Sequence, residues 1–159
     1  YLKVMKMNLR IIIEDKYKNA VKTKNITEIN TFRLIKSAIK DKDIASRNSK
    51  NNDNIGDPEI LSLLQNLIKQ RKDSIDSFKV ASRDDLISIE QGEIDIISQF
   101  LPIPMTEKEA EELIVKIIKD HKLESIRDMG KLMNELKINY AGSLDMALAG
   151  KIAKSKLII

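Results

Sequence analysis

A run of cations and hydroxyls between residues 69 and 83 is the part of this chain whose side chains most clearly suggest chemistry. Ammonium, guanidinium and hydroxyl groups are donors that proteins use to bind phosphate oxygens. Lys69 and Lys72 stand three positions apart, so on a helix they would share one face and could share one anionic partner. The predicted RNA- or partner-binding residues of this group are Lys69, Arg71, Lys72, Ser74 and Arg83.

The same cations have a structural alternative, because acidic residues are interspersed among them. Asp73, Asp76 and Glu90 could neutralise them inside a helical bundle. Structural pairing with Arg71 and Arg83 is also the expected role of the acids that follow, which are Asp84, Asp85, Glu90, Glu93 and Asp95. Arg71 falls on the apolar stripe of its predicted helix, which favours a partly buried ion pair for that residue. From the residues alone, binding and internal pairing both stay open.

A second, smaller basic group lies near the C-terminal end of the chain. Gly130 is predicted inside a helix, where glycine is unfavourable unless another backbone or a ligand approaches closely. Lys131 follows it, and Lys151 and Lys154 stand about one turn apart on the last predicted helix. These four residues join the predicted binding set, with ordinary surface lysines as the alternative.

Side chains for catalysis or metal binding are sparse. Glu90 and Glu93 would share a helix face, but no His and no second carboxylate pair stands at a metal-binding spacing. His121 is the single His, no Cys occurs, and no GxSxG motif supports a nucleophile. We therefore predict no catalytic residue and no metal, and we do not expect the chain to be catalytic by itself.

Nucleotide cofactors and base stacking are also disfavoured. Neither a GxxxxGK[ST] loop nor a GxGxxG loop occurs, so no cofactor is predicted. With 3 Tyr, 3 Phe and no Trp, the chain has few rings on which single-stranded bases could stack. A bound RNA would therefore be recognised by its backbone and shape, as a folded tRNA can be, and no DNA is expected.

Composition describes a folded helical protein with an uneven charge. Hydrophobic residues make up 42% and charged residues 33% of 159 residues, with only 5 Gly and 3 Pro. Residues 1–56 hold 13 Lys and Arg against 6 Asp and Glu, a net charge of +7. Such a segment favours a polyanion, although solvated lysines on helix faces would look the same.

Cellular location follows from what the composition lacks. The absence of Cys fits a reducing cytoplasm, and apolar runs such as Ile11–Ile13 are far too short to span a membrane. The start of the chain shows no secretion signal, and Met5 or Met7 is a possible initiating residue. We therefore expect a cytoplasmic protein without a membrane partner.

Helical periodicity predicts an N-terminal helical domain over residues 1–101 with long amphipathic helices. One helix is predicted from about Met7, and the residues on its apolar face are Leu9, Ile13, Tyr17, Ala20 and Val21. A second helix is predicted after Thr27, and its inward residues are Ile29, Phe32, Leu34, Ile35, Ala38, Ile39 and Ile44. Residues 47–56 read as a loop. Asp57 and Pro58 start a third helix to about Ala81, and Ser82 with Asp85 caps a fourth that carries Leu86, Ile89, Ile94, Ile97 and Phe100. Gly92 inside it suggests close packing.

Pro102 and Pro104 separate this domain from a C-terminal three-helix bundle over residues 105–159. Thr106 with Glu109 forms a capping box for its first helix, and Ser125 with Asp128 caps the second. Residues 140–142 turn the chain, and Ser143 or Asp145 starts the last helix. The predicted fold class is therefore all-α, in two parts.

Several motifs in order resemble the YqeY family, relatives of the tail domain of the B subunit of tRNA-dependent amidotransferases. The motifs that carry the resemblance are Thr31–Lys40, Lys69–Phe78, Arg83, Phe100–Pro102, Asp128–Met133 and Tyr140–Gly142. The resemblance implies an all-helical, two-part protein and a tRNA-associated accessory role in translation. It links the chain to a carbon–nitrogen ligase that uses glutamine as amido donor, but the amidase and kinase parts of that machine are missing here.

Two functions follow as expectations. The first is binding of tRNA or of a tRNA-processing enzyme, either an amidotransferase or an aminoacyl-tRNA synthetase. The second is a protein–protein adaptor that uses apolar grooves and binds no RNA. The sequence does not identify the tRNA, the protein partner or the oligomeric state.

Overall fold

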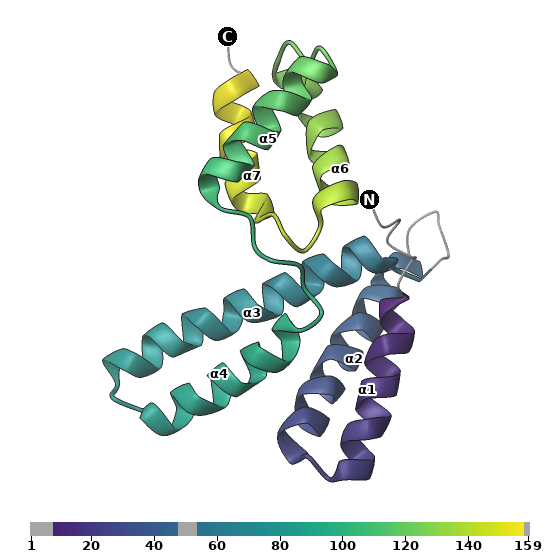
Figure 1. The fold of residues 1–159 in the computed structure, drawn as a ribbon, viewed down its shortest axis with the longest axis vertical. Helices are drawn as coiled ribbons and strands as arrows, with labels where there is room; N and C mark the ends of the chain where they lie inside the picture. The colour runs from purple at the N-terminus through teal and green to yellow at the C-terminus, as the bar shows by residue number, and fades with distance from the viewer. Residues whose placement is uncertain (1–7, 48–53, 158–159) are drawn as a thin grey trace. The chain divides into compact units, whose positions relative to one another are not determined.

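A computed structural model describes residues 8–47 and 54–157 of the chain, and these residues form two compact units, divided between Phe100 and Leu101. Seven α-helices, one short 3-10 helix and no strand occur among them, which confirms the all-α fold class (Figure 1). The possible starts at Met5 and Met7, and positions 48–53 of the loop predicted over residues 47–56, lie outside the described residues; Arg47 still belongs to α2, and positions 54–56 are not helical.

The N-terminal unit begins with a helical hairpin of α1 (Leu9–Thr23) and α2 (Ile26–Arg47). Lys24 adopts a left-handed conformation with φ of 57°, which ends α1 and turns the chain. The Asn25 side chain then accepts a hydrogen bond from the Glu28 backbone N–H at 3.1 Å. Asn25 therefore caps α2, and the predicted start after Thr27 is wrong by two residues, because an Asx side chain is available earlier.

A second hairpin follows, made of α3 (Asp57–Val80) and α4 (Asp84–Ser98). The Asp57 carboxylate accepts a hydrogen bond from the Leu9 backbone N–H at 3.2 Å, so it serves the start of α1. Ser82 has φ of 54°, and Arg83 N–H donates to the Phe78 carbonyl at 2.9 Å, a pattern that ends a helix. The predicted cap of α4 by Ser82 is therefore wrong, since Ser82 terminates α3 instead.

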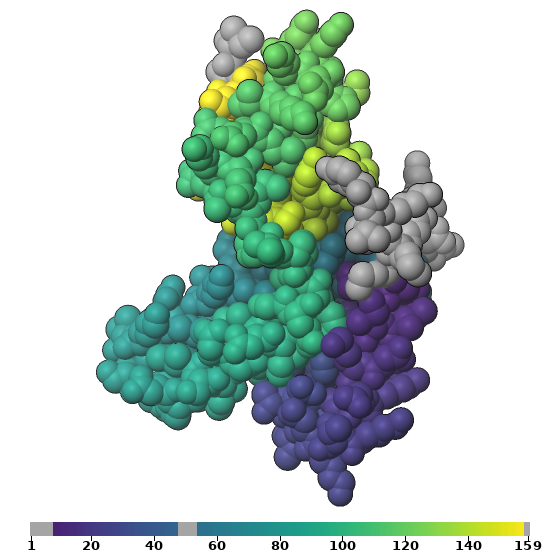
Figure 2. All heavy atoms as spheres, in the orientation of Figure 1, coloured from purple at the N-terminus to yellow at the C-terminus, as the bar shows by residue number. Residues whose placement is uncertain are grey.

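The core of the N-terminal unit lies where the two hairpins pack together. Its largest fully buried side chains are Phe32, Ile13, Ile35, Ile60, Leu64 and Ile97. The Phe32 ring meets the Phe100 ring edge to face, with centroids 6.0 Å apart and planes at 69°. In the space-filling view, the end of the hairpin where α3 turns into α4 projects away from α1 and α2 (Figure 2).

Four apolar side chains predicted on inner faces are instead exposed. They are Val21, Leu34, Ile44 and Ile89, whose exposed fractions range from 40% to 55%. Ile44 lies beside Asp43, which is only 7% exposed and occupies the inner position of that turn. One helix face accommodates only part of each apolar cluster, and packing decides which members it takes.

Gly92 in the middle of α4 is not closely packed, so the predicted close approach is wrong. A Cβ added there would meet nothing within 4 Å. Gly92→Ala is therefore expected to stabilise the protein by about 1 kcal/mol, because glycine loses more backbone freedom in a helix than alanine. Urea unfolding measures the change. Gly142→Ala is the matched control, and it should destabilise because Gly142 has φ of 88°; a loss of stability in Gly92→Ala would contradict the expectation.

The C-terminal unit contains α5 (Glu107–Asp120), the 3-10 helix η1 (Ile126–Asp128), α6 (Met129–Tyr140) and α7 (Met146–Leu157). The capping box at its start is confirmed, with hydrogen bonds of 3.2 Å in both directions between Thr106 and Glu109. Asp145 rather than Ser143 caps α7, since its carboxylate accepts from the Ala147 N–H at 2.9 Å. The buried core is formed by Ala110, Ile114, Ile117, Leu132, Leu136, Leu144, Ala149, Ala153 and Leu157.

The cap predicted at Ser125 and Asp128 is also confirmed, although it precedes a 3-10 turn. The Asp128 carboxylate accepts from the backbone N–H groups of Glu124 at 2.8 Å and Ser125 at 3.3 Å. These hydrogen bonds lower the pKa of Asp128, and the charge of Lys131 adds to the effect.

Candidate functional site

The structure neutralises the two arginines of the predicted α3–α4 site. Arg71 is 9% exposed; its Nε lies 2.7 Å from Glu93 Oε2, and its Nη1 donates to the Leu67 carbonyl at 2.9 Å. Arg83 pairs with Asp85 at 2.9 Å on the surface, and this pair raises the pKa of Arg83. Arg71 is thus held inside the hairpin. The predicted pairing of the α4 acids with these arginines is confirmed at Glu93 and Asp85, whereas Asp73, Asp76 and Glu90 are not the partners.

The remaining members of that group face outward. Lys69 and Lys72 are exposed one turn apart on α3, and neither forms an ion pair with a described residue. The Ser74 hydroxyl donates to the Gln70 carbonyl at 3.1 Å, so its hydrogen is already used within the helix. Of the five predicted residues, only the two lysines present unpaired charge.

The second predicted group is divided between two helices of the C-terminal unit. Gly130 lies in the first turn of α6, and a Cβ there would meet nothing within 4 Å, so the predicted tight helix crossing is wrong. Lys131 is exposed on α6, whereas Lys151 and Lys154 are exposed on α7. This group and the α3 lysines belong to different units.

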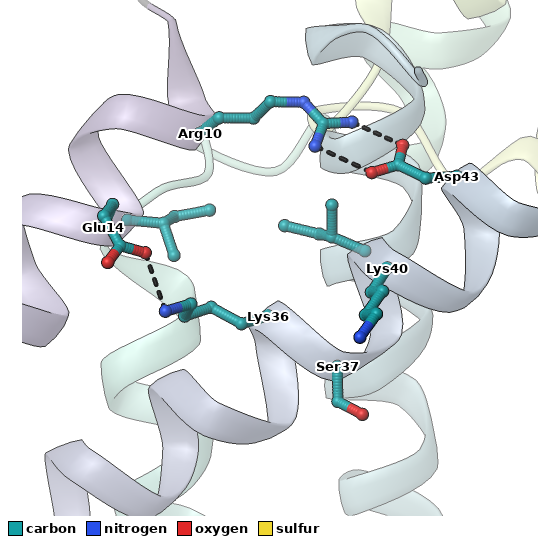
Figure 3. A pocket seen from close by; sticks show the side chains of 8 residues that line it. Arg10, Glu14, Lys36, Ser37, Lys40 and Asp43 are labelled. Atoms are coloured by element: carbon teal, nitrogen blue, oxygen red, sulfur yellow. Dashed lines mark hydrogen bonds and ion pairs between the residues drawn. The ribbon is translucent and has the colours of Figure 1, made fainter. Parts of the chain in front are cut away.

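A groove between α1 and α2, absent from the predicted site, brings several charged side chains together. Its volume is about 460 Å³, with Ile13 and Ile39 among its lining residues. Two ion pairs cross it, Arg10 with Asp43 and Lys36 with Glu14, as Figure 3 shows. The polar residues that line it are Arg10, Glu14, Lys36, Ser37, Lys40 and Asp43.

The Arg10–Asp43 pair is a structural contact that links α1 to α2 at one end of the groove. Arg10 Nη1 donates to Asp43 Oδ2 at 2.8 Å and Nη2 to Oδ1 at 2.5 Å, a bidentate arrangement. Arg10 also donates to the Ile55 carbonyl at 2.9 Å, and the Ile55 N–H donates to Asp43 at 2.9 Å. The Arg10 guanidinium holds the pKa of Asp43 below its ordinary value, so the carboxylate is charged at neutral pH.

The Glu14–Lys36 pair is more open, with both side chains more than a third exposed and a separation of 2.7 Å. The Lys36 ammonium lowers the pKa of Glu14 and also lies 4.3 Å from the centre of the Tyr17 ring. Arg33, one turn before Lys36, donates from Nε to the Tyr17 hydroxyl at 3.4 Å. Tyr17 therefore contacts two cations of α2, of which Lys36 lines the groove.

Charge differs sharply between the two hairpins of the N-terminal unit. The segment Leu9–Arg47 contains 10 Lys and Arg and 5 Asp and Glu, which gives a net charge of +5. The segment Asp57–Ser98 contains 5 Lys and Arg and 9 Asp and Glu, which gives a net charge of −4. A polyanion would be attracted to α1 and α2 and repelled by most of α3 and α4. In the sequence, the spacing of Arg33, Lys36 and Lys40 is the signal that indicates a cationic face on α2.

No helix in the described part of the chain is long and apolar enough to cross a membrane.

Comparison with known proteins finds relatives in fungi. The protein named "Altered inheritance of mitochondria protein 41, mitochondrial" of Saccharomyces cerevisiae is 34% identical over 90 residues, which cover 57% of this chain and 46% of that protein. Its namesake in Pyrenophora tritici-repentis is 32% identical over 125 residues, 76% of this chain and 66% of that protein.

An uncharacterized protein of Schizosaccharomyces pombe is 32% identical over 95 residues, 60% of this chain and 73% of that protein. The chain spans about half the length of the Saccharomyces cerevisiae relative. The model of the family described as "Yqey-like protein" matches residues 10–157, nearly the whole chain. This protein therefore belongs to the YqeY family.

Proposed function

We propose that this protein is a tRNA-associated accessory factor that binds the phosphate backbone of a folded tRNA. The observation that carries the proposal is the set of exposed lysines on rigid helices that form no ion pair with any described residue. Such cations bind phosphates by releasing counterions, without reading bases. The lysines of the predicted site that meet this description are Lys69, Lys72, Lys131, Lys151 and Lys154.

The wider context of this role is also part of the proposal. We propose that the protein acts beside a tRNA-processing enzyme, an amidotransferase or an aminoacyl-tRNA synthetase, in the cytoplasm. Support comes from membership in the YqeY family, together with the resemblance of the sequence motifs to relatives of the amidotransferase tail domain. Two fungal relatives have "mitochondrial" in their names, so a location in that organelle is the competing expectation.

Electrophoretic mobility shift with unfractionated tRNA tests the proposal. The wild-type protein should bind, and about four phosphate contacts would weaken the affinity about 100-fold between about 50 and 200 mM salt. A double variant, Lys69→Glu with Lys72→Glu, asks whether the α3 lysines take part. Failure of the wild-type protein to shift tRNA at either salt concentration would contradict the proposed function.

A protein–protein adaptor is the second candidate, and α4 favours it. Between Asp84 and Ser98 the helix has 5 acidic residues and no Lys or Arg, a net charge of −5, and its Ile89 side chain is 55% exposed. An acidic helix with an exposed apolar residue suits a basic protein partner better than RNA. Under this alternative, a pull-down of the partner survives nuclease treatment.

A further inference from the structure

The geometry points to the groove side of α2 as the main phosphate-binding surface of this protein, in place of the α3 site predicted from sequence. We call this surface the α2 cationic face and define it by Arg33, Lys36, Ser37 and Lys40. The inference rests on the proposed function, since it names the surface through which the tRNA backbone would be held. Its ligand class is the phosphodiester backbone of a folded RNA.

The spacing of the cations places them in a row. Arg33, Lys36 and Lys40 follow one another by three and four positions, so they lie on one face of α2. At 1.5 Å per residue the row covers about 10 Å along the helix. Lys36, Ser37 and Lys40 line the groove, whereas Arg33 lies outside its lining and donates to the Tyr17 hydroxyl at 3.4 Å. A row of donors of this length can contact successive phosphates of one strand.

The charges of the row are available to a ligand. Arg33 and Lys40 are exposed, and neither pairs with an acidic group among the described residues; in Figure 3 Lys40 lies beside the groove with no dashed line to it. Lys36 is held by Glu14, but an exposed ion pair of this kind is weak and exchangeable. A phosphate can therefore replace Glu14 as the ion-pair partner of Lys36.

The support beneath the row is rigid. Ile13 and Ile39 are 1% and 6% exposed, and the bidentate Arg10–Asp43 pair ties α1 to α2 at one end of the groove. Cations on a preorganised surface lose less conformational freedom on binding than cations on a mobile segment. Arg10 and Asp43 thus frame the surface, and they are not assigned to the ligand.

The α3 lysines have a less favourable setting. Asp73 stands four positions after Lys69, and Asp76 stands four positions after Lys72, so a carboxylate lies one turn from each ammonium. The α3–α4 hairpin as a whole has a net charge of −4. A polyanion approaching α3 would meet both signs, whereas α1 and α2 together present a net positive charge.

Loss-of-binding variants test the inference against a matched control. Lys40→Gln removes an exposed charge on the groove side, and Lys42→Gln removes the same charge from the same helix at a position outside the groove lining. Lys40→Gln should weaken tRNA binding several-fold more than Lys42→Gln. Arg33→Gln with Lys40→Gln should weaken it about tenfold and reduce the salt slope by about two. Circular dichroism checks that each variant keeps its helices.

A gain-of-binding variant tests the same surface in the opposite direction. Glu14→Gln releases Lys36 and removes one negative charge from the groove, so tRNA affinity should rise several-fold. Asp15→Asn changes the net charge equally, but Asp15 lies outside the groove lining and should have a smaller effect.

The outcomes separate the inference from the proposed function. If wild-type protein binds tRNA but Lys40→Gln matches Lys42→Gln, and Glu14→Gln matches Asp15→Asn, the α2 cationic face is wrong while tRNA binding stands. If Lys69→Glu with Lys72→Glu abolishes binding that Arg33→Gln with Lys40→Gln leaves intact, the site returns to α3. If wild-type protein binds no tRNA, both the function and the surface are overturned.

Discussion

Phe32→Ala is expected to destabilise the N-terminal unit by about 3–5 kcal/mol, the range for removing a buried aromatic ring from a core. Phe32 is 1% exposed in the first half of α2, and its ring packs edge to face against Phe100. The lost contacts therefore connect α2 with the segment that directly follows α4. Because the environment is closely packed, the cavity would be only partly filled by relaxation.

Urea unfolding of Phe32→Ala and of a control, Phe78→Ala, measures the difference. Phe78 is only partly buried on α3, so the same deletion there should cost much less. Hydrogen exchange resolved by segment adds a second readout, because we propose that residues 1–101 and 105–159 unfold as separate domains. Protection should fall in α1–α4 and persist in α5–α7; equal loss in both units would contradict separate unfolding.

Asp43→Ala is expected to be the next most damaging substitution, at about 2–4 kcal/mol. It removes both hydrogen bonds to Arg10 and leaves the Ile55 N–H without its partner. Most of the cost is the desolvation of a guanidinium left unpaired in a partly buried place. Asp41→Ala on the exposed side of α2 is the matched control, measured by urea unfolding at neutral pH. Equal destabilisation by the two substitutions would contradict the role of the pair.

The same carboxylate gives the N-terminal unit a defined acid sensitivity. Arg10 lowers the pKa of Asp43 in the folded state, so the stabilisation is complete above the unfolded pKa of about 3.9 and is lost as pH falls through the lower folded value. Wild-type protein should therefore lose stability in acid, and the difference from Asp43→Asn should shrink there. A difference that stays constant between neutral pH and about pH 3 would argue against this linkage.

Local signals in the chain were sufficient for the helices and several of their ends. The capping residues Thr106 with Glu109 and Ser125 with Asp128 act over three positions, so their geometry depends little on the rest of the fold. The prediction that Ser82 caps α4 is wrong because a residue at a helix junction can end one helix or begin the next. Its left-handed φ resolves the choice, and the sequence does not display a backbone angle.

Contacts between distant positions depended on packing. The partner of Arg71 is Glu93, 22 positions away, and the partner of Arg10 is Asp43, 33 positions away. Periodicity placed Arg71 on an inner face, but the choice among nearby acids follows from how α3 and α4 align. The same holds for the groove: spacing along α2 places Arg33, Lys36 and Lys40 on one face, but the groove beside Lys36 and Lys40 exists only where α1 supplies Ile13 and Glu14. Helix formation and the faces of single helices follow from short-range spacing, whereas a groove requires side chains from two helices to meet.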